Sequence, residues 1–124
     1  MTEAPGILIV RERIPADELA RLVRLYFEDM VKFVVDIRRG VVAVGGELHA
    51  DAEQLLLGEG SRQEDIWGAN YYPGAGDEQC IECTALINIR PSAGNRGMEI
   101  EDAGVRARVR ELTFSLIGRG EPLP

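Results

Sequence analysis

Two valine-rich segments separated by only three residues place the strongest limit on the fold of this chain. The segments are VKFVVDI at residues 31–37 and VVAVGG at residues 41–46, and Arg38, Arg39 and Gly40 join them. Valine, isoleucine and phenylalanine favour extended strands, and a short link that contains glycine favours a tight turn between two strands. The sequence therefore predicts a β-hairpin in the first half of the chain.

Further strands and helices are predicted on both sides of this hairpin. Apolar segments at residues 7–12, 66–72 and 80–90 have the composition of strands, and we expect the last two to form a second antiparallel pair. Apolar residues recur at helical spacing after Pro15, Leu48 and Asp102, and Asp102 is expected to cap the last of these helices. Ser61 begins a capping-box pattern for a further short turn. This order predicts an α+β fold, with a mostly antiparallel sheet and the helices packed on one face.

The length of 124 residues suits one domain, 1–124, in which we expect residues 1–6 and 119–124 to be frayed ends. The net charge of −7 disfavours nucleic acids and anionic membranes as partners, because both attract basic surfaces. The sequence contains no apolar segment long enough to span a bilayer and no pattern of a secretory leader, so a cytoplasmic location is expected.

The only two cysteines, Cys80 and Cys83, form a single C-x2-C motif. A zinc site would need more ligands than this pair and one histidine provide, and a redox pair usually lies at a helix N-terminus rather than on a strand. We therefore interpret Cys83 as a core residue and Cys80 as a residue at the surface or the strand end.

The most polar segment is GGELHADAE at residues 45–53, which follows the second valine-rich run and contains the only histidine. If it is helical, His49 and Glu53 lie one turn apart and can form a surface pair, while Asp51 complements the helix N-terminus. If it stays extended, Glu47, His49, Asp51 and Glu53 share one face and could chelate a divalent cation. The neighbouring alanines and leucines favour the helix. The paired glycines Gly45 and Gly46 lack the remainder of a nucleotide-binding motif and indicate a bulge or a close backbone approach.

A second group of polar residues lies in the second half of the chain. On a continuous strand over residues 80–90, Glu82, Asn88 and Arg90 would share the face opposite the core, and the alternate residues, Ile89 among them, would face the core. Asn70 interrupts an apolar strand, and Asn95 and Arg96 lie in the loop that follows. The two arginines, Arg90 and Arg96, could together hold a carboxylate or phosphate group.

Four segments resemble one small prokaryotic family that is classed as a domain of unknown function. They are MVKFVVDI, GGELHADAE with a following GS, WGANYYP, and INIRPSAGNR, and the resemblance extends from residue 14 to residue 117. The resemblance implies an α+β domain. It implies no reaction, cofactor or partner, and the cysteines of CIEC are not part of its motifs.

Two functional hypotheses follow from these patterns. In the first, the chain is an enzyme or binder with a polar pocket for a small ligand, which an anionic group would suit. A metal could assist in this pocket, and no cofactor is identified. His49 would carry protons beside Glu47 and Glu53, and the ligand contacts would be Asp51, Asn70, Glu82, Asn88, Arg90, Asn95 and Arg96. In the second, the domain is a non-catalytic homodimeric or interaction module that exposes Tyr71, Tyr72 and Leu86.

Overall fold

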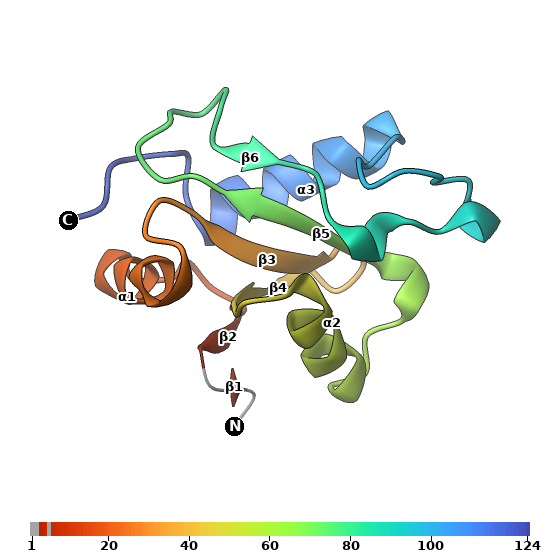
Figure 1. Cartoon of the computed structure of the whole chain (residues 1–124), viewed down its shortest axis with the longest axis horizontal. Coiled ribbons are helices and arrows are strands. Elements are labelled where there is room, and N and C mark those ends of the chain that lie inside the picture. The colour runs from red at the N-terminus through yellow and green to blue at the C-terminus, as the bar shows by residue number, and fades with distance from the viewer. Residues whose placement is uncertain (1–2, 5) are drawn as a thin grey trace.

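The computed structural model describes residues 3–4 and 6–124 (Figure 1). Six strands form one sheet in the order β1-β2-β4-β3-β5-β6, and every neighbouring pair is antiparallel. The strands are β1 (Glu3–Ala4), β2 (Ile7–Val10), β3 (Val31–Asp36), β4 (Val41–Gly45), β5 (Ile66–Tyr71) and β6 (Ile81–Glu82). The helices are α1 (Ala16–Tyr26), α2 (His49–Gly58) and α3 (Ala103–Leu116). The predicted α+β class and the antiparallel sheet are confirmed.

The predicted hairpin is formed by β3 and β4, and a buried carboxylate holds its turn. Asp36 is fully buried, and its Oδ1 accepts the backbone N–H groups of Arg38 and Arg39 at 2.9 Å each. Ser61 donates its hydroxyl to Asp36 Oδ2 at 2.6 Å. Ser61 therefore ties the turn to the segment after α2, and its predicted role as a helix cap is wrong, because no side chain caps the short turn that follows it.

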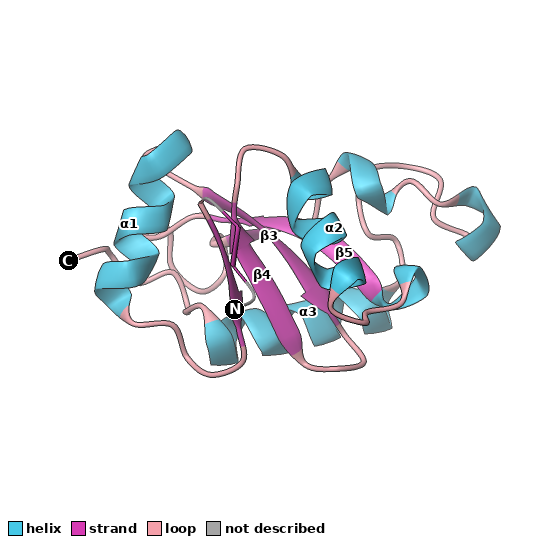
Figure 2. Cartoon of the chain, turned by 90° about the horizontal axis from the view of Figure 1, so that it is seen from below, coloured by secondary structure: helices cyan, strands magenta, loops and turns pink. Residues whose placement is uncertain are grey.

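The helices cover both faces of the sheet, which corrects the prediction that they pack on one face. Apolar residues of α1 and α3 form one core cluster with Phe33 and its neighbours on one side of the strands. Leu56 and Ala52 of α2 pack against Val34 on the other side. Figure 2 shows α2 and α3 on opposite sides of the sheet. The physical reason is that β4 and nearly all of β3 are buried on both faces, so each face needs a cover.

The predicted strand over residues 80–90 is mostly wrong. Only Ile81–Glu82 pairs with β5, and the chain then forms a 3₁₀ turn at Leu86–Asn88. The side chain of Asn88 takes the place of a partner strand at Gly68, because its Oδ1 accepts the Gly68 N–H at 2.8 Å and its Nδ2 donates to the Gly68 carbonyl at 2.9 Å. Asn88 is consequently fully buried rather than on a wet sheet face, and Ile89, predicted for the core, is 42% exposed.

The C-terminal residues 119–124, where a frayed end is expected, make backbone contacts with β5 and the loop that follows it. The Gly120 N–H donates to the Tyr71 hydroxyl at 2.8 Å, and the Gly120 carbonyl accepts the Gly76 N–H at 3.1 Å. At the other end, the prediction of fraying over residues 1–6 falls partly on residues 1, 2 and 5, which lie outside the described residues. Glu3–Ala4 pairs with β2.

Both cysteines are free thiols. Cys80 stands directly before β6, at the predicted strand end, but it is fully buried in the core cluster, and its carbonyl accepts the Tyr72 N–H at 2.7 Å. Cys83, predicted for the core, is partly buried and packs against that cluster. The predicted cap of the last helix is confirmed, since Asp102 Oδ1 accepts the Val105 N–H at 2.9 Å. Among the described residues, no helix is both long and apolar enough to cross a membrane.

Candidate functional site

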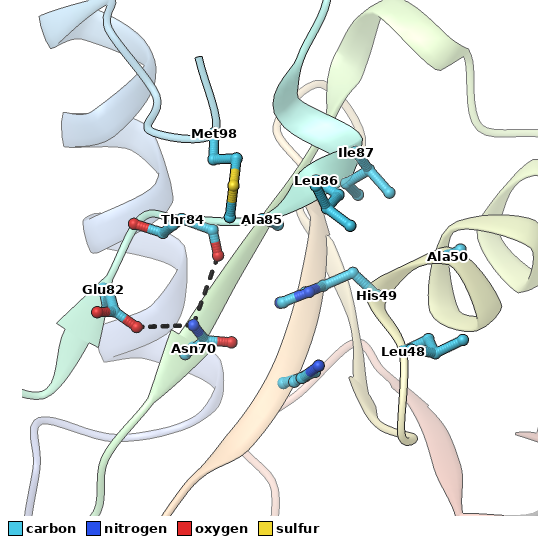
Figure 3. Close-up of a pocket in the computed structure, with 11 residues that line it drawn as sticks. Leu48, His49, Ala50, Asn70, Glu82, Thr84, Ala85, Leu86, Ile87 and Met98 are labelled. Carbon is cyan, nitrogen blue, oxygen red and sulfur yellow. Dashed lines mark hydrogen bonds between the residues drawn. The ribbon is translucent and has the colours of Figure 1, made fainter.

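A cavity of about 470 Å³ opens on the α2 face of the sheet, where α2 begins (Figure 3). We call it the His49 pocket. Its wall comes from the start of α2, from strands β3, β5 and β6, and from the irregular segment after β6. Its lining residues are Lys32, Leu48, His49, Ala50, Asn70, Glu82, Thr84, Ala85, Leu86, Ile87 and Met98.

The floor of the His49 pocket is a row of three polar side chains on three adjacent strands. Lys32 of β3 is the cross-strand partner of Asn70 of β5, and Asn70 is the partner of Glu82 of β6. Directly opposed residues in antiparallel strands project from the same face of a sheet. The register therefore places a cation, an amide and a carboxylate side by side on the α2 face of the sheet, where Asn70 is buried and Glu82 is exposed.

The amide of Asn70 is oriented by two acceptors. Its Nδ2 donates to Glu82 Oε1 at 2.8 Å and to the Thr84 carbonyl at 3.4 Å. Because both partners only accept hydrogen bonds, Oδ1 must point the other way, and Figure 3 shows it on the side of His49. Asn70 is only 7% exposed, and its Oδ1 is buried without a hydrogen-bond partner. This buried acceptor therefore lies on the side of His49, whose pKa the Asn70 side chain raises.

His49 begins α2 and is held over β5 by a hydrogen bond. Its Nε2 lies 2.8 Å from the carbonyl of Ala69. A carbonyl only accepts, so Nε2 carries the hydrogen, and the neutral ring has its lone pair on Nδ1. Burial lowers the pKa of His49, the Ala69 carbonyl and the Asn70 side chain oppose that shift, and the charge of Lys32 adds to it. The imidazole is therefore neutral at pH 7 and acts as an acceptor at Nδ1.

Two glycines allow the chain to place His49 in this position. Gly45 ends β4 with φ +111°, and a Cβ there would lie 2.0 Å from the carbonyl oxygen of Gly6. Gly46 also has a positive φ of +90°. Only glycine fits such a close approach in this backbone region. The predicted close backbone approach at the glycine pair is confirmed, and it lets the chain turn from β4 directly into α2.

The mouth of the His49 pocket is apolar. Leu48, Leu86 and Met98 are 55%, 71% and 41% exposed, and all three line the cavity. Single exposed apolar residues are common on proteins, but three around one polar-floored cavity form a surface suited to an apolar group. The pocket thus combines a polar floor with an apolar rim.

The structure brings together three of the predicted site residues, His49, Asn70 and Glu82, in the His49 pocket. Glu47 and Asp51 line a separate depression beside the β2 end of the sheet. Because residues 49–58 are helical, the extended four-residue chelate does not form. Within the described part of the chain, no group of three or more His, Cys, Asp or Glu residues could hold a metal ion.

Glu53 faces the end of α2 rather than the pocket. Its Oε2 accepts a hydrogen bond from Gln63 Nε2 at 2.6 Å. The buried His49 instead directs its ring to the sheet, so the two residues do not form the surface pair that helical spacing allowed.

The two asparagines of the INIRPSAGNR segment bind backbone groups. Asn88 forms hydrogen bonds with the N–H and the carbonyl of Gly68, and it also donates to the Met98 carbonyl at 3.0 Å. Asn95 is 3% exposed, donates to three carbonyls including that of Asn88, and accepts the Glu101 N–H at 2.8 Å. These hydrogen bonds hold the irregular segment of residues 85–101 in its conformation. Neither asparagine lines the His49 pocket.

The predicted arginine pair also lies outside the pocket. Arg90 donates to the carbonyls of Gln63 and Ile66, and its guanidinium lies 4.1 Å from the centre of the Trp67 ring. Arg96 is exposed, and its backbone N–H donates to Glu101. Arg90 therefore fastens the start of β5 to the segment after β6.

Sequence reasoning missed Lys32, which supplies the cation of the pocket. A signal was present, because Lys32 is the only lysine of the chain and every other basic residue is an arginine. It also interrupts the otherwise apolar strand VKFVV. The only lysine and the only histidine thus line the same cavity.

The comparison with protein families found one match. A family model for proteins of unknown function, DUF5674, matches residues 8–116. The chain belongs to the DUF5674 family. The comparisons with curated proteins and with solved structures found no match. Every residue that lines the His49 pocket lies within the segment matched by DUF5674, so the candidate site belongs to the part of the chain that defines the membership.

Proposed function

We propose that this chain binds a small ligand in the His49 pocket, with an anionic group at Lys32 and an apolar part against Leu48, Leu86 and Met98. One observation carries the proposal. The only lysine, the only histidine and the buried amide of Asn70 line one cavity, and they come from two strands and a helix. Pockets with an apolar wall and a few converging polar groups are the usual form of small-molecule sites.

Lys32 is the group that favours an anion. It forms no ion pair with any acid among the described residues, and its Nζ lies 5.1 Å from the centre of the Phe27 ring. A cation without a counter-ion beside an apolar wall attracts a negative group more strongly than it would in bulk water. The anionic preference predicted from the arginines is therefore proposed at Lys32 instead.

His49 supplies the acceptor of the proposed site. Its neutral ring presents the Nδ1 lone pair, because Nε2–H is bound to Ala69. If the bound ligand reacts, His49 is the pocket group that takes up a proton near neutral pH. Glu47 and Glu53 were predicted to act with it, but neither lines this cavity. The proposal therefore assigns proton transfer to His49 alone. The cytoplasmic location and the exclusion of nucleic acid and membrane partners stay predictions from the sequence.

The test uses the two unique side chains as reporters. Reductive ¹³C-methylation labels Lys32 and preserves its charge, and the imidazole signals report His49 in the same NMR spectra. Titration with small carboxylates and phosphate esters that carry apolar groups should shift both signals saturably. At a hundredfold excess over the dissociation constant, such a ligand should add about 2.7 kcal/mol of stability and raise the melting temperature by roughly 10 °C.

Two variants make the test specific. Lys32→Met should abolish the binding of the anion, whereas Arg62→Met, which removes an exposed cation elsewhere on the chain, should leave it unchanged. The proposal is wrong if no compound shifts either reporter, or if Lys32→Met binds every compound as well as the wild type does.

The alternative of an interaction module is favoured by one observation, the 71% exposure of Leu86 at the rim. Tyr71, which was predicted to be exposed, is only 1% exposed and cannot contribute to such a surface. A homodimer formed through the rim should dissociate in sedimentation experiments when Leu86 is changed to Ser and should be unaffected by Lys32→Met. A monomer at all concentrations excludes this homodimer.

A further inference from the structure

We infer that the ligand of the His49 pocket is a small zwitterion with an apolar group, whose carboxylate binds Lys32 and whose ammonium group binds Glu82. The inference rests on the proposed function, which assigns the anionic group to Lys32. It adds a second, opposite charge at a defined place on the same floor.

The carboxylate of Glu82 is oriented by hydrogen bonds but has no cationic partner among the described residues. Asn70 Nδ2 donates to its Oε1 at 2.8 Å, and the Tyr72 hydroxyl donates to the same oxygen at 3.1 Å. Both donors are neutral, and among the described residues Glu82 forms no ion pair. A carboxylate held in this way is an acceptor for a charged N–H donor, which forms stronger hydrogen bonds than a neutral one.

The two unpaired charges lie at opposite ends of one row. Lys32 and Glu82 are separated by one intervening strand, so their backbones are about 10 Å apart at the usual spacing of strands. Asn70 lies between them, and its side chain is buried, with an exposure of 7%. A ligand with a negative and a positive end fits this row with each charge beside its opposite.

A purely anionic ligand fits the same row less well. Its negative group at Lys32 would lie on the same floor as the Glu82 carboxylate, which repels it.

The apolar rim of the pocket adds an apolar group to the properties expected of the ligand. Leu48, Leu86 and Met98 surround the mouth and can bury one apolar side chain of the ligand. The matching compounds are apolar α-amino acids and short apolar peptides with free ends. Amino acids and peptides both carry a carboxylate, an ammonium group and an apolar side chain, but the distance between the two charges differs. Comparing the affinities of one amino acid and one peptide therefore distinguishes them.

The experiment compares four compounds by NMR titration of the full chain, with Lys32 and His49 as reporters. L-Leucine and leucyl-leucine carry both charges, 4-methylpentanoate carries only the carboxylate, and 3-methylbutylamine carries only the amine. At least one zwitterion should bind about tenfold more tightly than either single-charge compound. The tighter of the two zwitterions identifies the source.

Two variants assign the charges to residues. Glu82→Gln retains an acceptor for Asn70 and should reduce the affinity for the zwitterion to that for 4-methylpentanoate. Lys32→Met should reduce it to that for 3-methylbutylamine. Glu78→Gln removes an exposed acid from the loop before β6 and should change nothing.

The outcomes separate this inference from the proposed function. If 4-methylpentanoate binds as tightly as both zwitterions and loses its affinity in Lys32→Met, the anion site stands and the zwitterion inference is wrong. The inference is also wrong if Glu82→Gln leaves the affinity for the zwitterion unchanged. If none of the four compounds shifts either reporter, the zwitterion inference is wrong, and the proposed function is wrong as well if the phosphate esters also fail to shift them.

Discussion

The two faces of the sheet are built from alternate residues of the same strands, yet they differ in what covers them. On one face, α1 and α3 bury an apolar layer that includes Val31, Phe33 and Val35 of β3. On the other, α2 covers Val34 but begins at His49, beside the polar side chain of Lys32. A helix that starts partway across a sheet leaves the remaining strand positions open, and here those positions are polar.

A similar contrast separates two asparagines, Asn70 in β5 and Asn88, which bonds to the backbone of β5. Asn88 uses its donor and its acceptor on the backbone of Gly68. Asn70 uses only its donor and leaves Oδ1 unpaired. A fully hydrogen-bonded buried amide has no capacity left for a ligand, whereas a buried polar atom without a partner needs a separate explanation. This difference is our reason for separating the pocket from the structural asparagines.

The largest expected effect concerns the fully covered face. Phe33 is completely buried, and Phe33→Ala should lower the free energy of unfolding by about 3–5 kcal/mol, because it removes a large side chain and leaves a cavity. Denaturant unfolding followed by circular dichroism measures the change. A loss below about 1 kcal/mol would contradict the view that this face is the main core.

The second prediction compares the asparagines directly. Asn88→Ala should cost roughly 2–3 kcal/mol, because it leaves the N–H and carbonyl of the buried Gly68 without partners. Asn70→Ala should cost about 1 kcal/mol, because only the donor bonds of that amide are lost. The same unfolding assay ranks the two variants, and equal losses would remove the distinction between them.

The third prediction concerns pH. Burial lowers the pKa of His49 below its ordinary value of 6.5, so the unfolded chain binds a proton more readily than the folded chain does. The contribution of the neutral ring to stability is therefore complete above pH 6.5 and is lost as the pH falls toward the lowered pKa. Unfolding measured from pH 8 to pH 5 should show this decline in the wild type and a smaller one in His49→Gln. Identical pH profiles would show that His49 is not buried as a neutral group.

The smallest expected effect is at Lys32, the neighbour of Phe33 on the same strand. Without ligand, Lys32→Met should change the free energy of unfolding by no more than about 0.5 kcal/mol, because the side chain has no ion pair within the described residues. Thermal melts of the two proteins should nearly coincide. A large destabilisation would identify Lys32 as a structural residue and weaken the binding proposal.

Local patterns in the sequence determined much of the fold. The short link at Gly40 specified the β3–β4 hairpin, Asp102 specified the start of α3, and the pair at Gly45 indicated a close backbone approach. Each of these depends on neighbours a few residues apart, which is the range that turn chemistry and capping cover. Nearly all residues in both strands of the hairpin are buried, so both faces of the sheet need a cover. We predicted that the helices cover only one face.

The sequence alone also identified His49, Asn70 and Glu82 as candidate residues, but only tertiary structure decided that they share a cavity and that Lys32 joins them. Cross-strand neighbours are set by register, which pairs Lys32 with Asn70 and Asn70 with Glu82 across segments far apart in the chain. Burial decided the role of Asn88 in the same way. Its side chain reads as an ordinary polar residue on a strand, and only the open backbone of Gly68, brought beside it by folding, makes it part of the framework.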